Sequence, residues 1–133
     1  NTLTLRTSII GQELKTNYSL LNWFLSQKKQ IKGYKNAVFS GLTAPEIASV
    51  IHNYVIPNTK IRGIYHLSGR PISKYDLLYI FKKIYKKNIK IVPDFKIKIN
   101  RSLNSNLFQK ATGYKPPTWN KLIHEMYEFY KYN

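Results

Sequence analysis

Residues 3–11, Leu-Thr-Leu-Arg-Thr-Ser-Ile-Ile-Gly, are β-favouring and apolar almost throughout, and Gly11 ends the run. A short continuous apolar run of this kind is typical of a strand that is buried on both faces of a parallel sheet. Such a strand needs a neighbour on each side, and almost nothing in this sequence precedes it. Residues 3–11 therefore look like a strand without its sheet, and the pattern alone leaves open whether the sequence is a whole protein or the later part of one.

Apolar residues recur at three- and four-residue spacing in four later stretches, which predicts amphipathic helices. A fifth, shorter helix is expected between Ser105 and Gly113, because glycine is favoured just after a helix C-terminus. The apolar positions of the four stretches are Leu20, Leu21, Phe24 and Leu25; Ile47, Val50, Ile51, Tyr54 and Val55; Leu77, Leu78, Phe81, Ile84 and Tyr85; and Trp119, Leu122, Ile123, Met126 and Tyr130.

Two of these helices are expected to begin with a capping box, at residues 43–46 (Thr-Ala-Pro-Glu) and 73–76 (Ser-Lys-Tyr-Asp). In this motif the hydroxyl accepts from the backbone N–H three residues on, and the carboxylate there reaches back to the cap. Asn17 or Ser19 is expected to cap the first helix. The second helix should end before Pro57, because proline disfavours helix in the residue before it.

Three short strands are expected at residues 37–39, 63–67 and 90–92, the last closed by Pro93. The polar stretches 28–35 and 94–105, and a loop at 12–17, are expected to be irregular connections. Strands that alternate with helices predict an α/β fold with short, mostly parallel strands and four to five helices. Residues 1–133 are expected to form a single domain.

The composition excludes several classes of protein. A chain of 133 residues that is 43% hydrophobic is large and apolar enough to bury a core, which argues against disorder. No apolar run reaches the roughly 18–20 residues that a membrane span needs, and the first residues lack the layout of a signal peptide. The absence of cysteine excludes disulfides and thiolate metal sites and favours a cytoplasmic protein.

The formal charge of +16 invites a nucleic-acid interpretation. Lysines outnumber arginines 18 to 4 and are spread along the chain, whereas recognition of phosphates and bases favours arginine. Lys82, Lys83, Lys86 and Lys87 fall opposite the apolar face of their helix, which predicts a solvated surface. A small basic module that binds nucleic acid or another polyanion is therefore kept as the alternative function.

No catalytic or metal-binding constellation emerges from the residues alone. The histidines lie in different elements without ligand spacing, and no glycine-rich phosphate loop follows a strand. Two segments match Tyr-x-x-x-Lys, a proton-donating dyad in some reductases: Tyr79 with Lys83, and Tyr127 with Lys131. With 11 tyrosines in a lysine-rich chain, such matches are expected by chance, so neither pair is predicted to be catalytic.

Several stretches do carry a resemblance: residues 5–11 (Leu-Arg-Thr-Ser-Ile-Ile-Gly), 63–69 (Gly-Ile-Tyr-His-Leu-Ser-Gly), 73–77 (Ser-Lys-Tyr-Asp-Leu), 100–105 (Asn-Arg-Ser-Leu-Asn-Ser) and 116–119 (Pro-Pro-Thr-Trp). In this order they resemble the C-terminal part of extended short-chain dehydrogenase/reductases that act on nucleotide sugars. The most similar branch is the dTDP-4-dehydrorhamnose reductase-like proteins and NAD-dependent epimerases. The resemblance covers essentially the whole chain.

In that family an N-terminal Rossmann part holds NAD or NADP and carries the Tyr-x-x-x-Lys dyad, and the C-terminal part covers the nucleotide sugar. The resemblance implies that this chain is the substrate-binding portion of such an NAD(P)-dependent reductase or epimerase of polysaccharide synthesis. It would then be inactive alone and bind no cofactor by itself. Its partners would be the nucleotide sugar and the N-terminal Rossmann half.

The resemblance also implies roles for individual residues. Residues 1–11 would be a late strand of the Rossmann part. Ser8 and Ile9 would lie at the edge of the nicotinamide and sugar site. Arg101 would contact the pyrophosphate of the substrate, and its planar guanidinium suits phosphate oxygens. Ser105 would support that loop or cap the following helix, and Thr43 would lie near the substrate entrance. No catalytic residue and no metal ligand is expected in this chain.

The sequence departs from the family pattern directly after Arg101. The family has proline at the position of Ser102, and proline restricts the backbone of a loop. The conformation of this loop therefore does not follow from the resemblance.

A third interpretation concerns association. If residues 3–11 have lost their sheet neighbours, Leu3, Leu5, Ile9 and Ile10 form an exposed apolar patch, and such patches drive association. Self-association through this surface is therefore one expectation. We expect the strand either to recruit another partner or to be displaced from the position that it has in the family.

Overall fold

The computed structural model describes residues 2–11 and 19–132. Within these ranges the elements follow in this order: β1 (Leu3–Arg6), β2 (Ile9–Ile10), α1 (Leu20–Ser26), β3 (Gln30–Phe39), β4 (Leu42–Thr43), α2 (Ala44–Val50), the π-helical turn η1 (Ile51–Val55), β5 (Gly63–His66), β6 (Ile72–Ser73), α3 (Lys74–Ile84), β7 (Lys90–Asn100), α4 (Asn106–Thr112) and α5 (Trp119–Tyr132). This is the expected α/β fold with five α-helices and mostly parallel strands. The expected loop at 12–17 lies outside the described residues.

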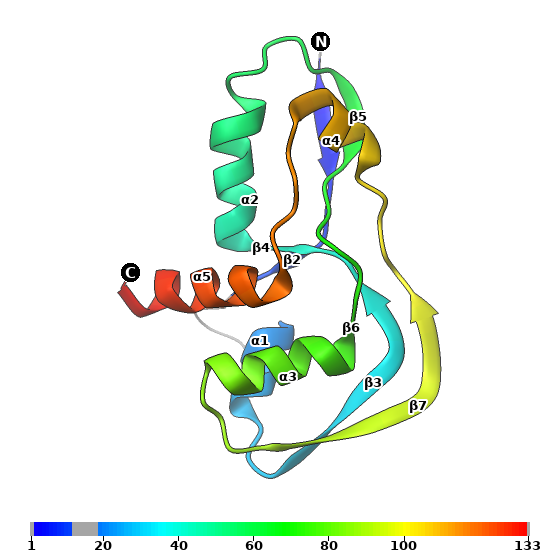
Figure 1. The fold of residues 1–133 in the computed structure, drawn as a ribbon, viewed down its shortest axis with the longest axis vertical. Coiled ribbons are helices and arrows are strands. Elements are labelled where there is room, and N and C mark those ends of the chain that lie inside the picture. Colours follow the sequence, from blue (N-terminus) through cyan, green and yellow to red (C-terminus); the bar gives the residue numbers. More distant parts are fainter. Residues whose placement is uncertain (1, 12–18, 133) are drawn as a thin grey trace.

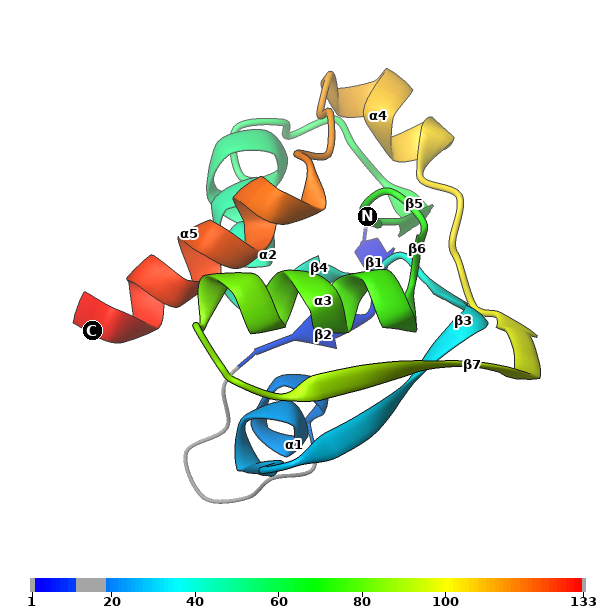
Figure 2. The same ribbon diagram turned by 60° about the horizontal axis from the view of Figure 1, so that its bottom comes forward.

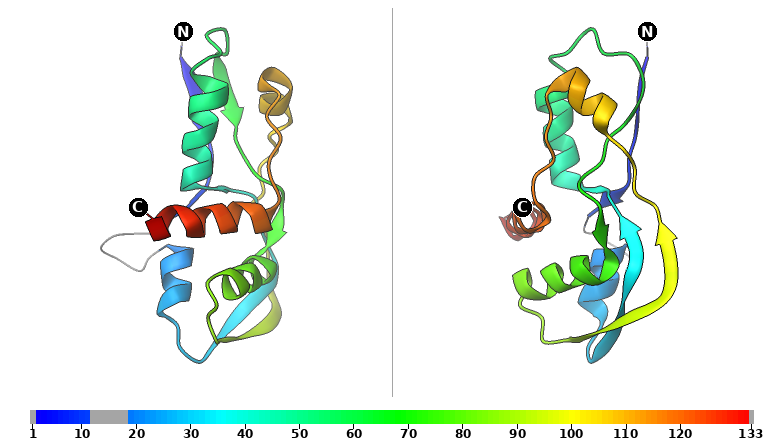
Figure 3. Two further views of the ribbon diagram at one scale, coloured as in Figure 1. Left: turned by 60° about the vertical axis from the view of Figure 1, so that its left-hand side comes forward. Right: turned by 45° about the vertical axis from the view of Figure 1, so that its right-hand side comes forward.

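The elements gather at two ends of an elongated molecule (Figure 1). One end holds the parallel pair β1–β5 with α2 and α4, and the other holds the curved pair β3–β7 with α1 and α3. Helix α5 crosses between the two ends. The views in Figures 2 and 3 agree that α1 and α3 lie on the concave side of the β3–β7 pair.

The expected strand at 3–11 divides into two. Residues 3–6 pair with β5, and Ile9–Ile10 pairs with β4, both in parallel. The expectation of burial on both faces is wrong: along β1 half-buried and exposed residues alternate, and Ile9 is 61% exposed whereas Ile10 is buried. The chain changes its pairing strand at Thr7-Ser8, from β5 to β4. Within the described residues, β1 and β2 therefore each have a neighbouring strand on one side alone.

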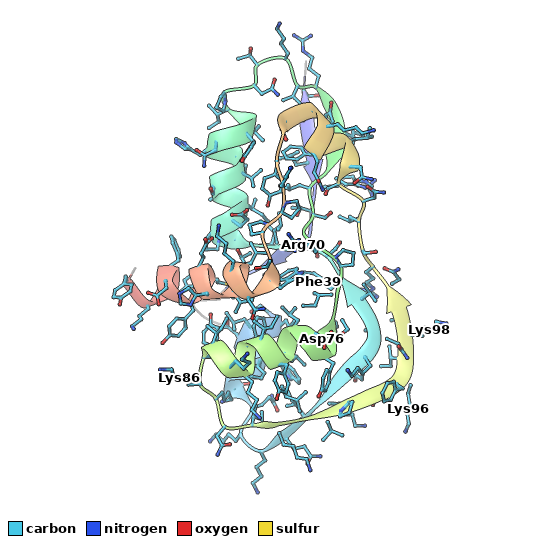
Figure 4. The ribbon with its side chains drawn as sticks, viewed as in Figure 1. Phe39, Arg70, Asp76, Lys86, Lys96 and Lys98 are labelled. Atoms are coloured by element: carbon cyan, nitrogen blue, oxygen red, sulfur yellow. The ribbon has the colours of Figure 1, made fainter. Side chains whose placement is uncertain are left out.

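Two strands are far longer than the pattern predicts. The stretches 28–35 and 94–105 were expected to be irregular, but β3 covers residues 30–39 and β7 covers residues 90–100. The two pair in parallel, and Pro93 lies within β7 opposite Gly33 instead of ending the strand. Residues 95–99 alternate apolar and lysine, a period of two that marks a strand with two different faces. Figure 4 shows Lys96 and Lys98 on the outer side of β7.

The helix starts follow the sequence closely. The hydroxyls of Ser19, Thr43 and Ser73 accept from the backbone N–H three residues on, at 3.3, 3.3 and 3.1 Å. Ser105 and Gly113 flank α4 as expected, although the Ser105 hydroxyl makes no capping bond there. The helix after Thr43 ends before Pro57 as expected, its last turn being the π-helical η1.

The apolar faces of the helices meet in one core. Its fully buried members include Phe24 of α1, Phe81 of α3 and Phe108 of α4. The expected stripe of α5 is buried at Trp119, Leu122, Ile123 and Met126. No helix within the described residues has both the length and the apolar character to cross a membrane.

The lysine cluster of α3 is only partly a solvated face. Lys83 and Lys86 are exposed, but the ammonium of Lys87 donates to the carbonyl of Leu25 at 2.7 Å. That bond satisfies a backbone acceptor near the end of α1, where α1 carries no basic residue of its own.

The residues that follow α3 and α4 both have a left-handed backbone, which favours glycine. Introducing glycine after α3 and removing it after α4 should therefore change stability in opposite directions. Lys86 follows α3 with φ of 53°, and Gly113 follows α4 with φ of 80° and open space where a side chain would lie. The left-handed conformation costs a non-glycine residue about 1 kcal/mol or more. Lys86→Gly should therefore raise the free energy of unfolding by about 0.5–1 kcal/mol, and Gly113→Ala should lower it by about 1 kcal/mol.

Urea denaturation of the two variants and the parent chain checks this prediction. Lys83→Gly is the matched control, because it removes a neighbouring exposed lysine from a helical position and should destabilise. A loss of stability in Lys86→Gly as large as that in Lys83→Gly would contradict the account of this helix end.

The carboxylate of Glu46 does not complete the capping box. Its Oε2 instead accepts from the Tyr114 hydroxyl at 2.7 Å. Desolvation by burial raises the pKa of Glu46 above 4.5, although the Tyr114 bond acts against that rise. A raised pKa in the folded state means that the contribution of this group to stability is fully present below pH 4.5 and is lost as the pH rises through the folded-state pKa.

Glu46→Gln keeps an acceptor for Tyr114 and removes the titration. Relative to this variant, the parent chain should lose unfolding free energy as the pH rises from 4.5 towards neutrality. Denaturation curves of both proteins between pH 4 and pH 7 measure the difference directly. A parent chain that gains stability over the variant across this interval would show the opposite sign.

Candidate functional site

Three connecting segments are in backbone contact near the middle of the molecule: Thr7-Ser8 between β1 and β2, Ser40-Gly41 between β3 and β4, and Ser68-Gly69 after β5. We call this contact the crossing. The backbone N–H of Leu42 donates to the carbonyl of Ser8 at 2.9 Å, and that of Gly69 donates to the carbonyl of Ser40 at 2.6 Å. A Cβ at Gly41 would overlap the carbonyl oxygen of Ser8 and the ring of Phe39, so only glycine fits here. This crossing fixes the position of Ser8 relative to β3.

Buried serine hydroxyls attach the segment after β7 to the crossing. The hydroxyl of Ser40 accepts from the backbone N–H of Leu103 at 2.7 Å, and the hydroxyl of Ser68 donates to the carbonyl of Leu103 at 3.1 Å. The Ser105 hydroxyl donates to the carbonyl of Ser68 at 3.4 Å. All three serines are buried, so these bonds hold the loop 101–105 without competition from water.

The loop itself, which has serine at residue 102, is closed by a local turn. The side chain of Asn100 accepts from the backbone N–H of Ser102 at 2.9 Å and from its hydroxyl at 2.6 Å. The backbone N–H of Arg101 donates to the carbonyl of Val38 at 3.0 Å. An Asx turn of this kind restrains the backbone by hydrogen bonds where proline would do so covalently.

A cavity of about 360 Å³ lies on the concave side of β3 and β7. Its cations are Arg101 and Lys74, the first residue of α3, and it has no carboxylate in its lining. The remaining lining residues are Ser8, Ile9, Ile10, Leu20, Tyr34, Ala37, Val38, Phe39, Ile97 and Ile99. The cavity thus combines an apolar and aromatic wall with two positive charges, which suits an anion that carries an apolar or aromatic body.

The expected site residues lie in three places. Ser8, Ile9 and Arg101 line this cavity together. Ser105 lines a neighbouring groove beyond the loop. Thr43 is buried as the cap of α2 and lines neither of these two cavities.

Sequence reasoning did not assign the other nine lining residues to a site, and four of these carry the chemistry of the cavity: Tyr34, Lys74, Ile97 and Ile99. Ile97 and Ile99 carried a usable signal, because the lysine–isoleucine alternation there has the period of a strand. Tyr34 and Lys74 carried none, because only the folded chain brings β3 and the start of α3 together.

Two further sets of titratable side chains were weighed as candidates for catalysis or metal binding. Neither Tyr79 with Lys83 nor Tyr127 with Lys131 lines the cavity. In the described part of the chain, no three histidine or carboxylate side chains come close enough to hold a metal ion. Burial raises the pKa of Tyr85 to about 12, but its hydroxyl lies in the core without a hydrogen-bond partner among the described residues.

No protein-family model and no curated protein sequence matches this chain. Solved structures do match its fold. The chain superimposes on a dTDP-4-dehydrorhamnose reductase from Bacillus anthracis, solved with NADP, with a TM-score of 0.78 and 13% identity, over 96% of this chain and 48% of that one. A dTDP-4-dehydrorhamnose reductase from Clostridium acetobutylicum gives 0.74 and 13%, over 97% and 49%.

A UDP-N-acetylglucosamine 4-epimerase from Methanobrevibacter ruminantium, solved with UDP-N-acetylmuramic acid, matches with a TM-score of 0.68 and 16% identity, over 98% of this chain and 46% of that one. This chain has the fold of one half of these nucleotide-sugar reductases and epimerases. It spans about half the length of the solved structures that it matches, as the sequence resemblance predicted.

Because the backbones are so close at the crossing, a single methyl group added at residue 41 should destabilise the fold strongly. Gly41→Ala should lower the free energy of unfolding by about 2 kcal/mol or more, because the new carbon meets backbone atoms that cannot move independently. Gly63→Ala is the control: its φ is 97°, but open space surrounds the position, so we expect about 1 kcal/mol. Thermal and urea unfolding of both variants tests this, and equal losses would show that the crossing is loosely packed.

Proposed function

We propose that this chain is the substrate-binding portion of an NAD(P)-dependent nucleotide-sugar reductase or epimerase, and that its cavity binds the nucleoside diphosphate. The observation that carries the proposal is the pairing of Arg101 and Lys74 in a cavity with an apolar and aromatic wall. The solved structures of the same fold, whose names include a dTDP-sugar reductase and a UDP-sugar epimerase, support it.

The two cations suit a pyrophosphate. Both side chains are exposed at the cavity, and neither makes an ion pair with any described residue. The planar guanidinium of Arg101 can donate two parallel hydrogen bonds to one phosphate, and the Lys74 ammonium supplies a point charge to the other. The Ser40 and Ser68 bonds hold the loop in place before any ligand arrives, so less ordering is needed on binding.

The wall of the cavity suits a nucleobase. Tyr34 of β3 offers an aromatic ring, and Ile97 and Ile99 of the neighbouring strand β7 offer aliphatic surface. We assign the sugar to the side of Ser8 and Ile9, where the substrate would meet the cofactor-binding half. Ser105 acts on substrate through the loop that it anchors to Ser68. Thr43 acts only through the start of α2.

The residues of this chain do not fit a dinucleotide site. No glycine-rich turn joins a strand to a helix in the sequence, and neither Tyr-x-x-x-Lys pair reaches the cavity. We therefore assign NAD or NADP, and the hydride transfer that it performs, to a separate Rossmann part. The chain alone is proposed to be inactive and cytoplasmic. Its partners are the nucleotide sugar and that Rossmann part, which would meet the surface around Ile9.

Association with a second copy through this surface is the weaker proposal. Of the four residues expected in the apolar patch, Ile9 is exposed, Leu3 and Leu5 are half-buried, and Ile10 is buried.

The alternative function, binding of nucleic acid or another polyanion, would use a different face. The ammonium of Lys35 of β3 lies 4.2 Å from the Tyr75 ring centroid of α3, and that of Lys82 lies 5.8 Å from the Tyr79 ring centroid. Interleaved aromatic rings and cations are typical of single-strand binding surfaces. The two interpretations therefore predict different residues for the contact.

Titration of the chain with dTDP and UDP, followed calorimetrically, tests the proposed function. Arg101→Ala should weaken binding about 10-fold or more, the effect of losing charge-assisted hydrogen bonds to a phosphate. Lys74→Ala should weaken it to a smaller extent. The matched control is Lys98→Ala, which removes a charge from the outer side of β7 and should leave the affinity within about 2-fold.

Two results would overturn the proposal. One is equal weakening by Lys98→Ala and Arg101→Ala, which would mean that only the overall positive charge attracts the nucleotide. The other is tighter binding of a random single-stranded oligonucleotide than of dTDP, reduced by Tyr79→Ala and unaffected by Arg101→Ala.

A further inference from the structure

The neighbouring groove, of about 580 Å³, is larger than the cavity described above. Three connecting segments form it: residues 68–71 between β5 and β6, residues 102–106 from the end of β7 to the first residue of α4, and Lys115-Pro116 before α5. Gln109 of α4 completes the lining. The loop 101–105 separates the two spaces, because Arg101 lines one and Ser102 the other.

The groove is positively charged, and its cations make no ion pairs with the described residues. Arg70 and Lys115 line it, and the lining includes no carboxylate. Neither cation makes an ion pair or a side-chain hydrogen bond with any other residue in the part of the chain that the structure describes. Both are exposed, so they are free to bind an anion from solution.

The floor of the groove is held rigidly. The indole N–H of Trp119 donates to the carbonyl of Arg70 at 2.6 Å, which fixes the backbone of that residue and leaves its guanidinium free. Figure 4 shows Arg70 where its segment passes the first turn of α5. On the opposite side, the amide of Gln109 donates to the buried Ser105 hydroxyl at 2.8 Å. A site whose backbone is fixed in this way loses little entropy on binding.

The lining also indicates what kind of anion fits. Its remaining polar side chains are hydroxyls and amides, including Ser102, Asn104 and Asn106, and it contains no aromatic ring. A nucleobase would find no ring to stack on, in contrast to the cavity with Tyr34. Hydroxyls and amides are suited to the hydroxyl groups of a sugar, and the two cations to a phosphate.

We propose that this groove is a second ligand site, which binds a phosphorylated sugar through Arg70 and Lys115. It is distinct from the nucleoside diphosphate cavity and does not depend on the function proposed for that cavity. Because the two sites share the loop 101–105, a ligand in the groove and a ligand in the cavity should change each other's affinity by the same factor.

Titration with glucose 1-phosphate, followed by NMR of the backbone amides, tests this proposal. Shifts should concentrate on residues 68–71, 102–106 and 115, with saturation at millimolar concentration. Neutral glucose and inorganic phosphate should each bind at least about 5-fold more weakly. Glucose lacks the phosphate that the two cations bind, and inorganic phosphate lacks the sugar hydroxyl groups. Arg70→Gln and Lys115→Gln should each weaken binding about 5-fold or more, while the backbone bond from Trp119 to residue 70 preserves the fold.

The matched control is Lys110→Gln, which removes an exposed charge from α4 outside the groove and should leave the affinity unchanged. Equal weakening in Lys110→Gln, or binding of inorganic phosphate as tight as that of glucose 1-phosphate, would overturn the proposal in favour of general attraction of anions. Loss of glucose 1-phosphate binding in Arg101→Ala but not in Arg70→Gln would place the ligand in the other cavity and equally contradict it. Failure of dTDP to bind has no bearing on this result.

Discussion

The close approach of three backbone segments at Gly41 is the constraint on which the rest of the structure depends. Ser8, Ser40-Gly41 and Ser68-Gly69 come from connections far apart in the sequence, and a Cβ at residue 41 would overlap the Ser8 carbonyl. The two ends of the molecule are built on the strands that enter and leave this point. The strands form three separate small sheets, so the crossing, and not one continuous sheet, connects the two ends.

The crossing also explains how a polar loop becomes a binding element. Ser40 and Ser68 are buried at the crossing, and each offers its hydroxyl to the backbone of Leu103. These bonds fix the position of the loop 101–105 relative to the crossing. Within this loop, Arg101 lines the cavity of β3 and β7, and Ser102 lines the neighbouring groove. The ligand contacts proposed for this chain therefore rest on hydrogen-bonded connections, positioned by glycines that permit close contact.

Local signals predicted the helices well, because their caps and apolar stripes act within a few residues. Ser19, Thr43 and Ser73 cap as the sequence indicates. Strands were predicted less well. The lysines and Pro93 made β7 look irregular, yet an exposed outer face tolerates lysine, and an edge strand tolerates proline. The candidate residues Ser8, Ile9 and Arg101 came from a resemblance, whereas Lys74 and Tyr34 required the fold itself.

The location of bound nucleotide tests the central claim most directly. Backbone amide shifts on addition of dTDP, measured by NMR on the assigned chain, map the contact without any variant. The account predicts that shifts concentrate at Ser8–Ile10, at Ala37–Phe39 and at Ile97–Arg101, around the cavity of β3 and β7. Shifts concentrated instead on the exposed face of α3, at Tyr79 and Lys83, would contradict it.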